Sequence, residues 1–400
     1  MRHAILPHRR SVMLGILVVA ATSLTITSLV GCADSGSAIA HDGGTPPPVP
    51  GVDGGDDTDA DAGDAAARTC SDQGFCHVAV PAKETLRDVW GDGSTVWAVS
   101  EEGDVLRWDG QEWRIHTKKL GALYTIWGSG PTDIWLGGAN GLFHGTGASS
   151  QAIVFEPVDA PGDPAIPILS IWGTGPADVF AVGGHISEED FMPHGRVLRG
   201  AGAPGSPWEL DPLSDEPFVF KRVWGGPAVG TWLVGDEGYE GSMTGAIYVR
   251  APGTDDFAPV TIDASPPNGP DPSMPGGFVG GAVMADGRIL VIGKTTAFTA
   301  TFWYGALSSG GTMAWSYDVN RDERQVRAAW SIAGKDAWVA GDYGQLRGRS
   351  AASDEWVQAS MMITDLPVIE PLYGIWGSAA DDFWIVGRNT AIHRMSRKEP

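Results

Sequence analysis

The sequence contains little cysteine and little positive charge. Of its 400 residues 3 are Cys, and 27 Lys and Arg residues stand against 49 Asp and Glu residues, so the formal net charge is -22. A chain this acidic lacks the basic side chains that bind the phosphates of nucleic acid. We therefore expect no nucleic-acid partner.

Motifs that carry familiar chemistry are also missing. The sequence has no G-x-S-x-G nucleophile elbow, no H-E-x-x-H pair and no phosphate-binding Gly loop in a helical context. Two cysteines outside the N-terminal segment are too few for a structural zinc site, which uses four ligands. We expect no cofactor and no metal, and the sequence assigns no catalytic residue.

Glycine and tryptophan, in contrast, are plentiful. The chain holds 56 Gly and 17 Trp, and 42% of its residues are hydrophobic. Glycine at about twice its average share indicates frequent turns, and the apolar content is ample for a large core. The sequence therefore predicts a folded protein with many short elements.

The N-terminal segment has the layout of an export signal. An apolar stretch over residues 12–31 follows a charged start and ends in LVGC, residues 29–32, which resembles a bacterial lipobox. The resemblance implies a lipoprotein signal peptide over residues 1–31, cleavage before Cys32 and lipidation of its thiol, which anchors the protein to a membrane. Ala33 in place of Asp favours the outer membrane of the cell envelope, facing the periplasm or the surface. A plain membrane-spanning helix is the alternative.

Residues 32–69 are predicted to be a disordered tether. They consist mainly of Asp, Gly, Pro, Ala and Ser and have almost nothing apolar to bury. Cys70 and Cys76 follow, six residues apart. In an oxidising compartment we expect them to form a disulfide that fixes the start of a strand.

One sequence pattern recurs through the rest of the chain. Residues 123–145, LYTIWGSGPTDIWLGGANGLFHG, contain three short strand-like runs separated by Gly-rich turns. A repeat of roughly 45 residues with four strands is typical of a propeller blade, so residues 70–400 are predicted to form an all-β, seven-bladed β-propeller. The fifth copy, from residue 278 to 319, lacks the Trp-Gly anchor. The anchor tryptophans of the other copies are Trp90, Trp127, Trp172, Trp224, Trp330 and Trp376.

The seventh copy stops after three strands, so its fourth strand must come from elsewhere. Residues 75–80 have no blade of their own, and we expect them to pair with residues 391–395 and close the ring, which removes two free sheet edges. Alternation along the strands places the anchor tryptophans in the layer between neighbouring sheets, a structural role.

The phrases IWGSGPTDIW and VLRWDGQEW resemble the Trp-Gly propeller repeats of predicted bacterial secreted lipoproteins, which are mostly uncharacterised. The resemblance covers residues 75–396. It implies a fold and an envelope location more than an activity.

Three connections are longer than their counterparts, at residues 185–195, 236–245 and 264–277. Variable loops on a regular scaffold commonly carry function. We expect an interaction module that binds a protein or a glycan through these loops. The alternatives are an envelope glycan hydrolase or lyase that uses their acidic residues, and a structural subunit of an envelope or pilus-associated assembly. The candidate residues are His185, Glu188, Glu189, Asp190, Asp236, Glu237, Tyr239 and Glu240.

Overall fold

The computed structural model describes most of the chain from residue 69 onward. The described ranges are 69–81, 83–200, 207–238, 245–262, 277–294, 300–307, 312–320, 324–332, 337–350, 352–353, 355–363 and 367–395. The expected signal peptide with Cys32, and the tether up to residue 68, lie outside them. Within these ranges no helix has the length and hydropathy needed to cross a membrane.

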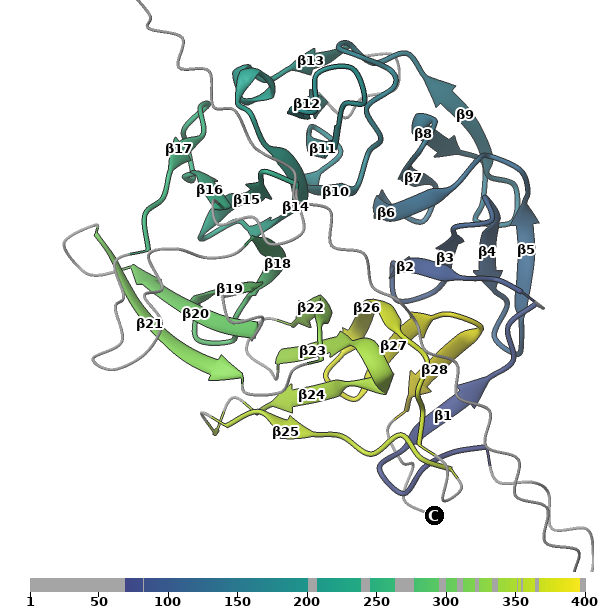
Figure 1. Ribbon diagram of the computed structural model, residues 1–400. Helices are drawn as coiled ribbons and strands as arrows, with labels where there is room; N and C mark the ends of the chain where they lie inside the picture. The colour runs from purple at the N-terminus through teal and green to yellow at the C-terminus, as the bar shows by residue number, and fades with distance from the viewer. Residues whose placement is uncertain are drawn as a thin grey trace, which may run out of the picture. The chain divides into compact units, whose positions relative to one another are not determined.

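Seven four-stranded antiparallel sheets form a ring around a central axis (Figure 1), which confirms the predicted all-β, seven-bladed propeller. Blade one is β2 (Leu86–Gly91), β3 (Val96–Ser100), β4 (Val105–Trp108) and β5 (Trp113–Thr117). Blade two is β6 (Leu123–Gly130), β7 (Asp133–Gly138), β8 (Gly141–Thr146) and β9 (Val154–Val158). Blade three is β10 (Ser170–Gly175), β11 (Asp178–Ile186), β12 (Pro193–Gly200) and β13 (Trp208–Leu210), followed by the 3-10 helix η1 (Pro212–Asp215).

The remaining blades follow the same order from the axis outward. Blade four is β14 (Val219–Gly226), β15 (Gly230–Asp236), β16 (Gly245–Arg250) and β17 (Ala258–Pro259). Blade five is β18 (Phe278–Val283), β19 (Ile289–Lys294), β20 (Ala300–Leu307) and β21 (Met313–Asn320). Blade six is β22 (Val326–Ser331), β23 (Ala337–Gly341), β24 (Leu346–Arg349) and β25 (Val357–Gln358), with the 3-10 helix η2 (Asp342–Gly344) after β23. Blade seven is β26 (Leu372–Ala379), β27 (Asp382–Gly387), β28 (Thr390–Arg394) and β1 (Phe75–Val78).

The core lies between neighbouring blades. Large tryptophans fill it: Trp97 and Trp232, on the second strands β3 and β15, and Trp303, on the third strand β20, are almost fully buried. Between blades one and two, Trp97 belongs to one apolar cluster with Leu123 and Leu136 of the next sheet. Alternation along each strand supplies both faces of a sheet with such residues, because each blade packs against two others.

The ring closes through a strand from the N-terminal side, as the sequence predicts. In β1, Phe75 lies opposite Arg394 and Val78 opposite Ala391 of β28. Phe75 is buried in the cluster between blades six and seven. The predicted disulfide is also confirmed, since Cys70 is bonded to Cys76 inside β1.

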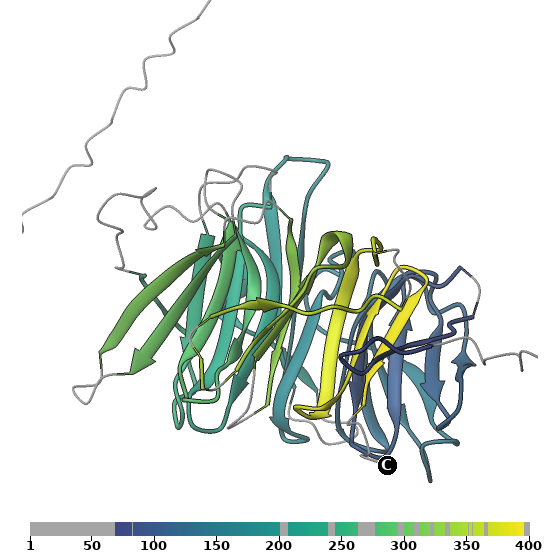
Figure 2. The same ribbon diagram turned by 90° about the horizontal axis from the view of Figure 1, so that it is seen from below.

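The segment 185–195 differs from the expected loop, because both of its ends continue the hairpin β11–β12 and residues 187–192 alone connect the two strands. His185 pairs with His194 and Ile186 with Pro193. Hydrogen bonds between backbone groups extend the two strands here whatever side chains they carry. Glycines that lie close to blade four interrupt the strand-like pattern of the sequence, so the extension is not visible in it. A Cβ on Gly184 would lie 2.8 Å from the Cα of Val219. In Figure 2 this teal hairpin projects from one face of the ring.

Blade five confirms the four strands expected of a degenerate copy. In the register of β18 with β19, Ala282 lies opposite Leu290, the place where the other innermost strands carry tryptophan. Its register shifts between Phe278 and Gly280, as it does near the start of the first strand in blade one, so the backbone of the blade does not depend on the anchor.

Candidate functional site

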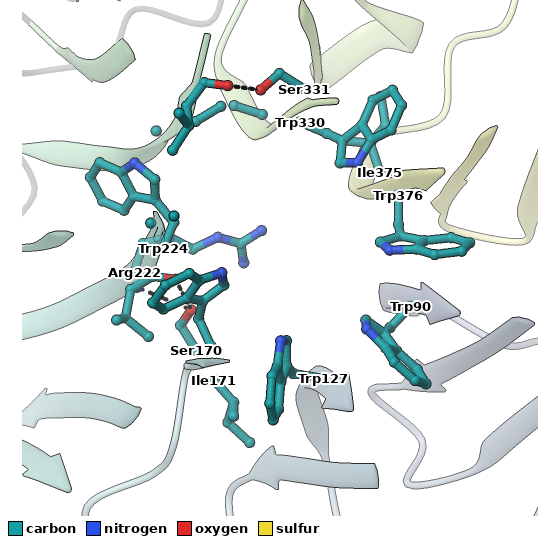
Figure 3. Close-up of a pocket in the computed structure, with 18 of the residues that line it drawn as sticks. Trp90, Trp127, Ser170, Ile171, Arg222, Trp224, Trp330, Ser331, Ile375 and Trp376 are labelled. Atoms are coloured by element: carbon teal, nitrogen blue, oxygen red, sulfur yellow. Dashed lines mark hydrogen bonds between the residues drawn. The ribbon is translucent and has the colours of Figure 1, made fainter. Parts of the chain in front are cut away.

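The six anchor tryptophans line the axial channel. They come from the innermost strands of six blades and surround a cavity of about 570 Å³ (Figure 3), whose wall continues to the turns at residues 226–229 and 284–287. Both turns join a first strand to a second strand, so the cavity reaches the face of the ring that carries those turns. Alternation along the strands predicts these tryptophans in the layer between neighbouring sheets. Because innermost strands border the axis, their side chains also face the channel.

Each anchor ring also packs on the next blade. A Cβ on Gly91 would come within 2.7 Å of the ring of Trp376, and a Cβ on Gly128 would come within 2.5 Å of the ring of Trp90. The glycine after an anchor therefore leaves room for the previous blade's indole. The Trp-Gly pair therefore packs neighbouring blades together around the channel. Its tryptophans have two roles, because they contact the next blade and also line the channel.

Two residues before the anchor, a polar side chain fastens each of the first three blades to the next. The Thr125 hydroxyl and the Ile126 N–H both donate to Asp88 Oδ2, each at 3.1 Å. The Ile171 N–H donates to Thr125 Oγ1 at 3.3 Å. Ser170 of blade three accepts in turn from blade four, as described next. We call these three side chains, Asp88, Thr125 and Ser170, the latch residues.

The fourth blade ends this series. The Val223 N–H donates to Ser170 Oγ at 3.2 Å, but Arg222, the residue at the latch position of blade four, extends towards the open centre of the channel (Figure 3). The next strand carries Gly280 at this position, where a Cβ would lie 2.9 Å from Arg222 Cγ. Glycine there makes room for the arginine stem.

Asp88 is a buried carboxyl in this wall. Burial raises its pKa above the ordinary value of 3.8, although the charge of Arg222 and hydrogen bonds from Ile126, Val89 and Thr125 act in the opposite direction. Its oxygens are occupied by these donors, because the Val89 N–H also reaches Oδ1 at 3.0 Å. Asp88 is therefore a structural carboxylate that is electrostatically coupled to Arg222.

On the opposite face, arginines and tyrosines alternate across four neighbouring blades. Arg327 lies 5.3 Å from the Tyr373 ring centre, and Arg87 lies 4.4 Å from the same ring and 5.8 Å from that of Tyr124. Each residue sits near the start of its innermost strand, where the antiparallel second strand ends. The hairpin β11–β12 connects a second to a third strand, so it lies on this same face. We call Arg327, Tyr373, Arg87 and Tyr124 the Arg–Tyr ladder.

The tip of the hairpin β11–β12 exposes apolar surface. The Phe191 side chain is 71% exposed and Met192 is 49% exposed. Phe191 has a φ of 57°, in the left-handed region that suits glycine or asparagine better than a bulky aromatic residue.

The predicted loop residues separate in the structure. His185, Glu188, Glu189 and Asp190 all belong to the blade-three hairpin, where Asp190 contacts His194 at 3.0 Å. Backbone hydrogen bonding by Met192, with His194 beside it, keeps the pKa of Asp190 below its ordinary value.

Asp236 is instead buried at the end of β15, where it pairs with Lys221 at 2.5 Å. Glu237 follows it in the chain. Tyr239, Glu240 and most of the segment 264–277 lie outside the described residues. The described candidate carboxylates therefore belong to two different blades, and the carboxylate of Asp236 is held in an ion pair with Lys221.

Two blades share a polar cluster that the sequence analysis missed. In blade two His144 contacts Asp133 at 2.6 Å and stacks on Trp135 at 3.9 Å between ring centres, while Ser129 donates to Asp133. Blade seven repeats this arrangement with Ser378, Asp382, His393 and Trp384. Repetition in two blades indicates a structural role. The spacing Ser-x-x-x-Asp followed by His eleven residues later is the signal that could have revealed it.

The channel wall itself offers few ionisable groups. Asp88 and Arg222 are the titratable side chains among its described lining residues. Among described residues no cluster of three His, Cys, Asp or Glu side chains could hold a metal ion.

The comparisons with known proteins support the fold alone. No family model and no curated protein matches the chain. Solved propellers resemble it at low identity. YCF48 bound to D1 peptide has a TM-score of 0.58 and 16% identity, covering 83% of this chain and 99% of that chain. Virginiamycin B lyase from Staphylococcus aureus, a catalytically inactive form with quinupristin, has a TM-score of 0.57 and 12% identity, covering 80% and 97%. The WD40 repeats of RRP9 have a TM-score of 0.56 and 8% identity, covering 82% and 99%.

Proposed function

We propose that this propeller is a lipid-anchored interaction module of the bacterial cell envelope that binds a partner protein through the face carrying the hairpin β11–β12. Phe191 carries the proposal: a large aromatic side chain is 71% exposed at a tip whose backbone, at φ 57°, disfavours it. Strain of this kind, of order 1–3 kcal/mol, is a reason to look for function.

The same face has the composition of a binding surface. Arginine and tyrosine are enriched among residues that dominate binding energies, and the Arg–Tyr ladder holds both in stacked contacts. Salt bridges hold the ladder cations: Arg87 contacts Glu101 at 3.6 Å and Arg327 contacts Asp342 at 2.5 Å. The face therefore offers ordered planar groups, which lose little conformational freedom on binding. YCF48, a propeller of similar fold, is bound to a peptide in its solved structure.

The location rests on the N-terminal sequence. The lipobox-like residues 29–32 and Ala33 support an anchor in the outer membrane through Cys32. Labelled palmitate should enter the wild-type chain and not a Cys32→Ser variant. Equal labelling of the two chains would remove the anchor from the proposal and leave the binding face untouched.

Photo-crosslinking tests the binding face directly. The full chain carries benzoylphenylalanine at position 191 in intact cells, and the matched control carries it at position 307, because Leu307 is 70% exposed on another blade. We expect one discrete crosslinked protein from position 191 and none of the same mass from position 307.

A pair of substitutions separates binding from folding. Phe191→Asn relieves the left-handed backbone strain, so the free energy of unfolding should stay the same or rise by about 1 kcal/mol. Affinity for the crosslinked partner should nevertheless fall, while Leu307→Asn should retain it. Equal affinity of both variants for that partner would show that the hairpin tip is not the anchor.

A further inference from the structure

The geometry points to a second binding site, in the axial channel, for a carboxylate carried on an apolar or aromatic group. The site is built from Arg222 and the ring of anchor indoles. It reaches the face opposite the hairpin β11–β12 and is independent of the function proposed above.

Arg222 supplies the charge. Figure 3 shows its guanidinium extended into the open centre, and no described residue forms an ion pair or hydrogen bond with it. A guanidinium presents five donors in a planar fork that matches a carboxylate. Gly280 leaves space for its stem, so the extended position is built into the next blade.

The wall adds hydrogen-bond donors without adding free acceptors. The indole nitrogens of Trp90, Trp127 and Trp376 face the centre in Figure 3, and an indole N–H can only donate. The side-chain oxygens of the wall already take part in hydrogen bonds, since Asp88 accepts from Thr125, Ser170 is bonded to Val223 and Ser331 is bonded to Val283. A ligand that accepts hydrogen bonds is therefore favoured over one that donates them.

The charge balance selects a monoanion. Arg222 is the one cation among the described lining residues, and the Asp88 carboxyl is electrostatically coupled to it. A phosphate dianion would lack a second cation, whereas one carboxylate matches one guanidinium. The overall charge of -22 acts from farther away and is screened over about 8–10 Å at physiological salt.

Size and polarity describe the remainder of the ligand. A cavity of about 570 Å³ falls within the range of small-molecule sites. Its six indole rings, with Ile171 and Ile375, offer apolar surface beyond the guanidinium. Both an aromatic acid and the C-terminal residue of a peptide present such a group next to a carboxylate.

Isothermal titration of the purified full chain tests the site with matched probes. The first pair is 3-phenylpropionate and its neutral amide, and the second is acetyl-Ala-Ala-Phe with a free or an amidated C-terminus. We expect at least one acid to bind about tenfold or more tightly than its amide, the size of one charge-assisted hydrogen bond. If 3-phenylpropionate binds and the peptide acid does not, the ligand of the site is a small acid. If the peptide acid binds more tightly, the ligand is the C-terminus of a peptide.

Arg222→Gln should abolish the preference for the acid, and Arg222→Lys should keep part of it because the charge remains. Lys221→Gln is the control, since Lys221 precedes Arg222 in the chain but pairs with Asp236 at the other face. Equal binding of acid and amide, binding of neither acid to the folded wild type, or an unchanged preference in a folded Arg222→Gln variant would overturn the proposal.

Discussion

Blades one to four and blades five to seven line the channel in different ways. At the latch position the first group carries Asp88, Thr125, Ser170 and Arg222, and the second carries Gly280, Ala328 and Gly374. In the first group three of these side chains bond to the next blade. In the second group, Gly280 leaves the space that the stem of Arg222 occupies, whereas Gly374 lets the backbone of blade one approach. A ring built from one repeat can thus use part of its lining for cohesion between blades and leave another part open.

The largest expected effect tests whether the core of blades one to four and the core of blades five to seven contribute equally to stability. Trp97 in blade one and Trp303 in blade five are both 0% exposed. Trp97→Ala and Trp303→Ala should each lower the free energy of unfolding by about 3–5 kcal/mol, because each leaves a large cavity. Chemical denaturation followed by circular dichroism measures both. A much smaller loss for Trp303→Ala would mean that blades five to seven are loosely packed and that the comparison concerns more than the channel wall.

The next largest effect is expected from a substitution that removes the hydrogen bonds of a latch residue. Thr125 donates to Asp88 and accepts from Ile171, so Thr125→Val removes both bonds at nearly constant volume. The free energy of unfolding should fall by about 1–3 kcal/mol, since a buried carboxylate loses a donor and a buried N–H loses an acceptor.

Ala328→Ser is the matched change in the other group. It introduces a hydroxyl at the latch position of blade six, facing the innermost strand of blade seven, and should change stability by less than Thr125→Val does. If Thr125→Val proves as mild as Ala328→Ser in the same denaturation assay, the latch contributes nothing to cohesion.

The smallest effect concerns two carboxyls of the first group whose pKa values move in opposite directions. Burial would raise the pKa of Asp133, but hydrogen bonds from His144 and Ser129 outweigh it and lower the pKa below 3.8. A lowered folded-state pKa stabilises the fold above the unfolded pKa, and this contribution disappears as pH falls through the folded value. Asp88 has a raised pKa, so its ionisation costs stability as pH rises above 3.8.

Thermal unfolding from neutral to acidic pH tests this sign. Asp133→Asn should be less stable than wild type at neutral pH, and the gap should shrink once pH falls below 3.8. A gap that stays constant over the whole range would show that the carboxylate charge of Asp133 does not stabilise the fold.

The strand pattern could be predicted because period-two alternation and Trp-Gly spacing are local signals. They predict the seven blades, which the structure confirms. The incomplete seventh copy predicts the closing strand β1, and two cysteines in an oxidising compartment predict the Cys70–Cys76 disulfide; both are confirmed as well. The extension of the hairpin at residues 185–195 was missed, because the glycines and the polar side chains of this segment hide a ladder made by the backbone.

The channel could not be predicted for a different reason. Alternation assigns a residue to a face of its sheet, but it does not say whether that face meets another sheet or the axis. Trp127 was therefore placed between blades and Arg222 was not singled out. Aligning the copies two residues before the anchor shows the signal: a cation stands at Arg222, where the other copies carry small or hydrogen-bonding residues. Expectations for Tyr239, Glu240 and Cys32 remain predictions.

The disulfide beside the closing strand has a mechanical consequence. Cys70 is the first residue of the blade region to be covalently fixed, and its bond to Cys76 bypasses Ser71–Phe75. Tension on the chain ahead of Cys70 would therefore act at Cys76, in the middle of β1, and not at a loop that could straighten. From there it would be resisted by the four registered pairs with β28 and by Phe75 seated between blades six and seven. Tension on the chain before Cys70 is in this way carried by the sheet of blade seven, where β1 closes the ring.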